Sequence, residues 1–209
     1  SSDLVPTCDR MHYDGREETL SARGDVRFRD NAEQVEVSGR RCTYDLRNRH
    51  CVLTGDPVFT RLDTAAAETL TIKARRMTYD DSAKVTTARE EVRITKGQLS
   101  ARCEEARYYT EAEIAMLRKS PDIAYGDQQL RGDSVDLMFR RDTLDAAEVV
   151  GDARGLYVER SEGDTTRTHV RGDSIFMALT DAGFLDSVYV CRNVRSTHFS
   201  RGDSLRGDE

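Results

Sequence analysis

The sequence lacks any apolar run long enough to cross a bilayer as a helix, which takes about 20 such residues. It also lacks a secretory signal at its beginning. Since the chain starts at Ser1 rather than at methionine, we expect a leader or tag to have been removed. Hydrophobic residues make up 37% of the 209 residues and charged residues 33%, proportions that favour a thin core over a large rounded one.

Enzyme motifs are missing as well: there is no GxSxG, no HExxH and no glycine-rich phosphate loop. The acidic pairs at residues 90–91 and 104–105 suggest acid and base partners, but neighbours in a strand point to opposite faces, so neither pair converges on one bond. The histidines lie far apart and are expected at the surface or at edges: His12, His50, His169 and His198. We therefore predict that the protein is not an enzyme and uses no cofactor.

A concentrated positive surface is also absent. The net charge is −6, and acidic and basic residues are interspersed along the whole chain. Because phosphate binding needs clustered positive charge, nucleic acid is not expected as a partner.

What the sequence does contain is a six-residue phrase that recurs about every thirty residues. Each copy begins with a small residue, continues with charged or polar residues, and in the first four copies ends in tyrosine. The copies are CDRMHY (8–13), GRRCTY (39–44), ARRMTY (74–79), CEEARY (103–108), GDSVDL (132–137), GDSIFM (172–177) and GDSLRG (202–207). A period of this length, kept from end to end, is typical of stacked repeat proteins.

Within each repeat the apolar residues alternate with polar ones. Met11 and Tyr13, and then Val26 and Phe28, are two residues apart, as expected for strands with one buried face. Aspartate, asparagine and glycine stand between the runs and favour tight turns, and the Gly-Asp pairs at 24–25 and 55–56 predict bends between strands. Residues 111–119 have a helix-like composition, but their place in the repeat predicts a strand. The fold class predicted is all-β: an elongated, twisted stack of short antiparallel strands.

The domain organisation expected is simple. Residues 1–7 form a polar lead-in, and residues 8–209 form a single elongated domain of about six full repeats and a partial seventh. Isolated repeats are not expected to fold, since each depends on its neighbours.

The five cysteines match no zinc-binding pattern, so no metal site is expected. Cys8 and Cys103 occupy the small position of the phrase, and Cys42 and Cys51 occupy apolar positions. One interpretation is that they are small buried apolar residues. The alternative is a Cys42–Cys51 disulfide across one hairpin, which an oxidising compartment would permit.

The inward positions of the repeats predict one continuous apolar strip along the stack. Its residues are Met11, Tyr13, Phe28, Tyr44, Leu53, Phe59, Met77, Tyr79, Ile94, Tyr108, Leu117, Tyr125 and Leu137. Two interpretations stay open: the side chains close on each other as a core, or they line a groove.

The repeat resembles the OstA-like family of lipopolysaccharide-transport proteins. The pattern is clearest in TYDLRNRHCVLTGDPVFT (43–60) and YDGREETLSARGDVRFR (13–29), and it weakens after Tyr125. The resemblance implies an elongated β-jellyroll whose apolar groove carries lipid A acyl chains. It assigns the residues of the strip to that groove.

The resemblance also implies a periplasmic location and a bridging role between the inner and outer membranes. The partners implied are lipopolysaccharide or a related glycolipid and other OstA-like proteins, joined by edge-strand addition as a head-to-tail oligomer. Two alternatives remain: a lipid-free structural scaffold with the same fold, and the amino-terminal periplasmic domain of a larger outer-membrane assembly protein.

Overall fold

The structure, a computed structural model, describes residues 5–30, 34–63, 68–140, 143–161, 164–180 and 185–200. All regular secondary structure in these residues is β-strand, so the predicted all-β class is confirmed. Residues 111–119 contain a strand, β11 (Ile114–Arg118), as their place in the repeat predicted. The last copy of the phrase, residues 202–207, lies outside the described part of the chain.

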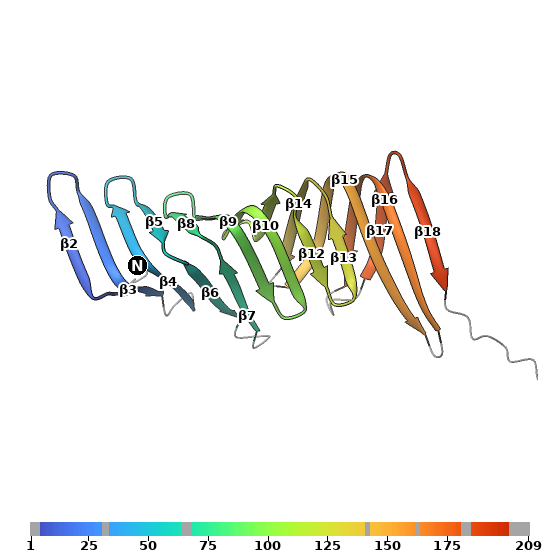
Figure 1. The fold of residues 1–209 in the computed structure, drawn as a ribbon, viewed down its shortest axis with the longest axis horizontal. Coiled ribbons are helices and arrows are strands. Elements are labelled where there is room, and N and C mark those ends of the chain that lie inside the picture. The colour runs from blue at the N-terminus through green and yellow to red at the C-terminus, as the bar shows by residue number, and fades with distance from the viewer. Residues whose placement is uncertain are drawn as a thin grey trace, which may run out of the picture.

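The strands stack side by side into a long body, with the chain advancing from one end to the other (Figure 1). One face, here called the tyrosine face, holds β2 (Arg10–Asp14), β5 (His50–Thr54), β8 (Arg76–Asp80), β11, β14 (Ser134–Arg140) and β17 (Leu185–Cys191). The opposite face holds β1 (Val5–Thr7), β6 (Val58–Asp63), β7 (Glu68–Lys73), β12 (Asp122–Tyr125), β13 (Gln128–Arg131) and β18 (Arg195–Ser200).

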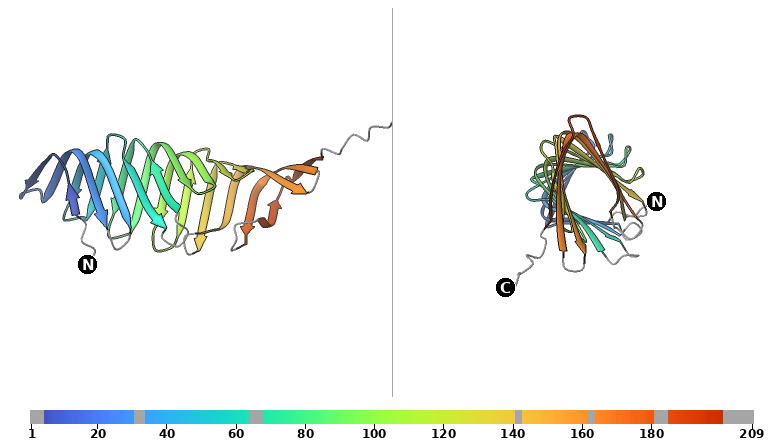
Figure 2. Two further views of the ribbon diagram at one scale, coloured as in Figure 1. Left: turned by 90° about the horizontal axis from the view of Figure 1, so that it is seen from below. Right: turned by 90° about the vertical axis from the view of Figure 1, so that its right-hand side faces the viewer.

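Longer strands bend from one face into the other. These are β3 (Thr19–Asp30), β4 (Val35–Asp45), β9 (Val85–Lys96), β10 (Leu99–Tyr109), β15 (Thr143–Ser161) and β16 (Asp164–Leu179). All the described pairings are antiparallel. The ladders of the short strands lie within one face, whereas β3–β4, β9–β10 and β15–β16 pair along both faces, with a register shift at the bend. Seen along the long axis, the two faces surround a common interior (Figure 2).

The bends between the faces lie along one edge of the body, here called the apex. Alternate bends consist of two successive residues with positive φ: 24–25, 55–56, 90–91, 119–120, 151–152 and 192–193. At Gly151 φ is 80°, a conformation that glycine adopts without steric strain. The Gly-Asp signals in the sequence therefore mark real changes of strand direction.

The recurring phrase supplies the bends in between. Its second residue donates a backbone hydrogen bond to the neighbouring bend, as in Asp9 N–H to Gly24 O at 3.1 Å and Asp133 N–H to Gly151 O at 2.9 Å. In two copies the first residue is glycine because the next strand packs against it: a Cβ on Gly132 would lie 2.5 Å from Cγ1 of Val149, and one on Gly172 2.7 Å from Cγ1 of Val190. The phrase is thus the signature of close strand packing at the apex.

The edge opposite the apex, where the hairpin tips of both faces end, is here called the mouth. On the tyrosine face, aspartates close the tips: Asp14 accepts from the backbone N–H of Arg16 at 2.9 Å, and Asp80 from those of Ser82 and Ala83 at 2.9 Å. These are the turns that the Asp-rich segments predicted.

The amino-terminal segment adds a short strand to the opposite face. The predicted lead-in, residues 1–7, contains β1, whose residue Pro6 pairs with Phe28 of β3. It pairs because the opposite face of the first repeat has a free edge there, and backbone groups at such an edge are available for hydrogen bonding.

Candidate functional site: the inner apolar column

The tyrosines of the repeated phrase stand in one row. Strand register connects Tyr13 to Leu20 and Tyr44, Tyr44 to Cys51 and Tyr79, and so on through Thr86, Tyr108 and Ala115 to Leu137. Residues about thirty positions apart in the sequence therefore lie above one another along the tyrosine face.

A second row runs beside the first, nearer the apex. Register takes it from Met11 through Ala22, Cys42, Leu53, Met77, Ala88 and Ala106 to Leu117. The opposite face contributes a third row: Phe28, Val37, Phe59, Ile72, Ile94 and Ala101. Tyr125 pairs with Leu99, one step nearer the mouth than this row. We call these rows together the inner column.

Exposure along the inner column changes strongly from its amino-terminal end to its centre. Met11 is 48% exposed and Tyr13 58%, whereas Met77 is 1% and Tyr108 5% exposed. Phe28, Tyr44, Tyr79 and Tyr125 are partly buried and pack against the core. The remaining predicted residues are buried: Leu53, Phe59, Ile94, Leu117 and Leu137.

The centre of the column is filled by its own side chains. A cavity of about 20 Å³ lies among residues that include Leu70, Ala88 and Tyr108, and one of about 10 Å³ lies beside Ile123 and Leu130. Each is about the size of a single water molecule. In this conformation the centre is a packed core, and apolar surface of the column is accessible chiefly at the amino-terminal end.

One contact spans the mouth at the centre. Arg61 of β6, on the opposite face, donates a hydrogen bond from Nη1 to the hydroxyl of Tyr108 on the tyrosine face at 3.0 Å. Sequence reasoning missed Arg61 as an inward residue. The signal was present, because Phe59 faces inward and strand alternation places Arg61 on the same side.

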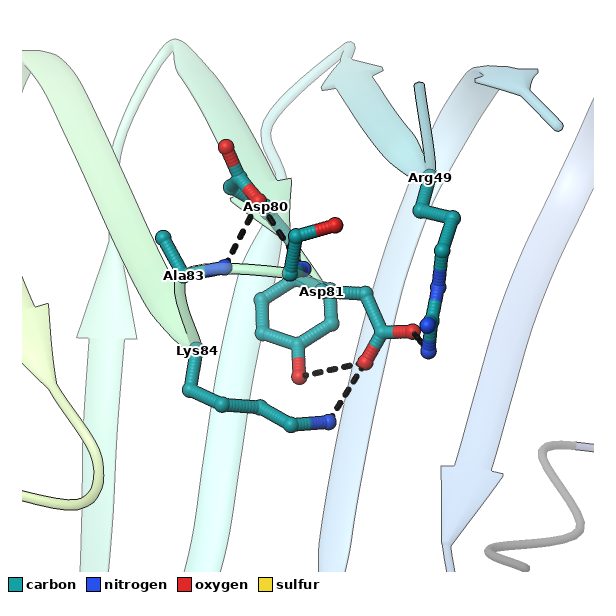
Figure 3. A network of polar contacts seen from close by, with 7 residues as sticks. Arg49, Asp80, Asp81, Ala83 and Lys84 are labelled. Atoms are coloured by element: carbon teal, nitrogen blue, oxygen red, sulfur yellow. Dashed lines mark hydrogen bonds and ion pairs between the residues drawn. The ribbon is translucent and has the colours of Figure 1, made fainter. Parts of the chain in front are cut away.

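Charged residues at the hairpin tips border the tyrosine row. Arg49 and Lys84 approach the carboxylate of Asp81 from two sides (Figure 3), with Lys84 Nζ 2.6 Å from Oδ1. The hydrogen bond from Lys84, and secondarily that from Arg49, lowers the pKa of Asp81. Burial raises the pKa of the nearby Tyr79, whose hydroxyl lies 3.4 Å from Asp81 Oδ1. At the mouth, the tyrosine face therefore carries a neutral tyrosine hydroxyl next to charged side chains.

The five cysteines differ in how far they are buried. Cys42, Cys51 and Cys103 are buried, Cys8 is partly buried and Cys191 is exposed. The Sγ atoms of Cys42 and Cys51 lie 3.1 Å apart inside the column. The two residues come from neighbouring strands, β4 and β5, and lie diagonally: the residue directly opposite Cys42 is Leu53, two positions from Cys51.

The described residues contain no group of histidine, cysteine or acidic side chains arranged to hold a metal ion. Within the same residues, no helix has the length and apolarity needed to cross a membrane.

Known proteins share this architecture. No curated protein matches the sequence significantly. The solved structure of LptH, the LptA homologous periplasmic component of the conserved lipopolysaccharide transport device from Pseudomonas aeruginosa, is similar over 56% of this chain and 83% of that chain, with a TM-score of 0.52 and 12% identity. At this identity the match shows a shared fold.

The sequence profile of a protein family provides the assignment. The profile described as "Lipopolysaccharide-assembly, LptC-related" matches residues 11–124, more than half of the chain. This match confirms the resemblance to lipopolysaccharide-transport proteins that the repeat suggested. The chain belongs to the LptC-related family of lipopolysaccharide-assembly proteins.

Proposed function

We propose that this protein is a non-enzymatic periplasmic carrier that holds the acyl chains of lipopolysaccharide against its inner column and forms part of a bridge between the inner and outer membranes. The observation that carries the proposal is the continuous apolar column, which runs along the long axis and is exposed at one end through Met11 and Tyr13. Each methylene buried there would contribute about 0.8 kcal/mol.

The inward residues predicted from the sequence are proposed as the lining of this route. Acyl chains would contact Met11, Tyr13, Phe28 and Tyr44 first, because these are exposed or partly buried. Passage through the centre requires the two faces to separate at the mouth. The topology supports this, because no ladder among the described strands joins the two faces at the mouth and the long strands keep the faces continuous at the apex.

Site-specific photo-crosslinking tests lipid binding. A photoreactive amino acid in place of Tyr44 or Tyr79 is expected to capture purified lipopolysaccharide. The matched control is Thr43, which neighbours Tyr44 in β4 but is exposed on the outer surface, and it should give no adduct. Absence of adducts at all inward positions would contradict the carrier function.

The ends of the stack support a head-to-tail assembly with further copies or with other OstA-like proteins. Among the described strands, β2 pairs only with β3 and β17 only with β16, so each leaves one edge available for strand addition. Light scattering should show a mass that rises with protein concentration. A synthetic peptide with the sequence of β17 should compete with this association, and a constant monomer mass would contradict it.

A lipid-free scaffold is the second candidate, and the packed centre favours it. Leu117 and Leu137 are 0% and 1% exposed, and the two cavities beside Leu137 hold no more than a water molecule. The crosslinking experiment separates the two functions: a scaffold gives adducts at neither Tyr44 nor Tyr79, whereas a carrier gives them at both.

A further inference from the structure

Two buried polar atoms in the interior of the carboxyl-terminal half of the stack have no hydrogen-bond partner within the described residues. They are the hydroxyl oxygen of Tyr157 and the amide oxygen Oε1 of Gln128. The Tyr157 side chain is only 7% exposed. Such groups are rare in protein interiors, because an unpaired buried hydroxyl or amide loses its hydration without compensation.

The two residues belong to adjacent strands of the opposite face. Register pairs Gln129 of β13 with Leu156 of β15, so Gln128 and Tyr157 stand together one step nearer the mouth. Both are on the inner side, since Gln128 is two residues from the buried Leu130 and Tyr157 is two residues from Gly155, which pairs with Leu130. The two unpaired atoms therefore belong to neighbouring inward side chains of the opposite face.

Gly155 makes room for the phenol ring. A Cβ at this position would lie 2.8 Å from Cε2 of Tyr157 and 2.9 Å from its hydroxyl oxygen, so the ring lies over the glycine backbone. Gly155 itself stands between Leu130 and Val170 in the ladder. The hydroxyl is therefore held deep among apolar neighbours rather than at the solvent-exposed rim.

The chemistry of the pair fits one kind of ligand group. Burial raises the pKa of Tyr157, which keeps its hydroxyl protonated and able to donate as well as accept. Gln128 offers an acceptor and also lines the cavity of about 10 Å³ next to Leu130 and Leu144. An alcohol both donates and accepts, so a hydroxyl on an otherwise apolar chain is a suitable partner for either atom.

We propose that Tyr157 and Gln128 form a recognition site for a hydroxyl group on an acyl chain, so that the column selects hydroxylated acyl chains over plain ones. This inference rests on the proposed function, because it requires acyl chains to occupy the column. A plain chain would leave both polar atoms unpaired, and a site that expects a hydrogen bond discriminates against ligands that lack it.

The test compares β-hydroxymyristate with myristate as competitors of a fluorescent fatty acid bound to the full chain. The unmodified protein is expected to prefer β-hydroxymyristate about ten-fold, the equivalent of one hydrogen bond. Tyr157→Phe and Gln128→Leu should each reduce this preference to about equal binding. The matched control, Gln129→Leu at the exposed neighbouring position of β13, should retain it.

Thermal unfolding gives a second readout. Because Tyr157→Phe removes an unpaired buried hydroxyl, it should raise the unfolding midpoint of the lipid-free protein by about 2–4 °C. A lowered midpoint would show that solvent already satisfies this hydroxyl, which would overturn the inference.

The outcomes separate the inference from the function beneath it. Equal binding of both fatty acids by the unmodified protein overturns hydroxyl recognition and leaves the carrier function standing. Binding of neither fatty acid, together with no lipopolysaccharide adduct at Tyr44 or Tyr79, overturns both.

Discussion

The amino-terminal hairpins and the centre of the stack have the same repeat but differ in burial. Met11 and Met77 occupy equivalent positions in two copies of the phrase and lie in one row, yet Met11 is 48% exposed and Met77 1%. Tyr13 and Tyr108 differ in the same way, at 58% and 5%. An identical local pattern thus gives an accessible apolar surface at one end and a closed core at the centre.

The difference in burial arises from the neighbouring strands. Strand β8, which carries Met77, pairs with β5 on one side and β9 on the other, whereas β2, which carries Met11, pairs only with β3 among the described strands. Across the interior, the first repeat faces β1, which is 3 residues long. Burial in a stacked repeat depends on the strands before, after and opposite, so the end repeat leaves apolar surface uncovered.

The largest expected effect is on core packing. Met77→Ala removes a side chain that is 1% exposed and should lower the free energy of unfolding by about 2–5 kcal/mol. Met11→Ala, the matched change at the open end, should lower it by less than about 1 kcal/mol. Urea unfolding of both variants measures the difference, and equal losses would show that the amino-terminal end is packed in solution.

The next effect concerns Cys42 and Cys51, which lie in the column between the open end and the packed centre. Their Sγ atoms are 3.1 Å apart, and we expect a disulfide to form in an oxidising compartment. The bond would close a short loop and add roughly 2–3 kcal/mol to stability.

Intact mass before and after reduction detects this bond, and thermal unfolding with and without reductant measures its contribution. Cys42→Ser serves as the control that cannot form it. Two free thiols at these positions after exposure to oxidised glutathione would contradict the prediction.

Substitutions in the bends at the apex should change the free energy of unfolding by a smaller amount. Gly151→Ala places a side chain at φ 80° and against Asp133, and should lower the free energy of unfolding by about 1–3 kcal/mol. Gly24→Ala makes the same change at the exposed end, with Asp9 as the neighbour, and should lower it less because that hairpin can shift. Denaturant titration compares the two, and a larger loss at Gly24 would reverse the comparison.

The smallest effect is electrostatic. The pKa of Asp81 is lowered by Lys84 and Arg49, so its carboxylate stabilises the folded protein above its usual pKa of 3.8, and this contribution is lost as pH falls through the lower folded value. Asp81→Asn should lower the free energy of unfolding by about 1 kcal/mol at neutral pH. The unfolding midpoints of the two proteins should converge below pH 3.8, and a constant difference would exclude this cause.

Much of the architecture could be predicted because it depends on local chemistry. Alternation at Met11 and Tyr13 predicted strands, the Asp-rich segments predicted the hairpin tips, and the Gly-Asp pairs predicted bends. The helix-like composition of residues 111–119 did not mislead, since the period of the repeat favours a strand there. The length of the repeat also brought the tyrosines into one row.

Other features could not be predicted from one sequence. The contact of Arg61 with Tyr108 depends on the distance between two faces that the chain reaches through separate repeats. Strand β1 forms within the polar lead-in because the edge of β3 is available for pairing. The absence of partners for Tyr157 and Gln128 in the described residues follows from the packing around Gly155.

The amino-acid sequence by itself determined the strands, their turns and bends, and many of the side chains that face inward, because each depends on residues close together in the chain. Only the tertiary structure decided which inward side chains are covered, which polar atoms lack partners and which cysteines meet. Those properties depend on what stands opposite and on either side, and the repeated pattern is nearly the same at the exposed end and at the closed centre.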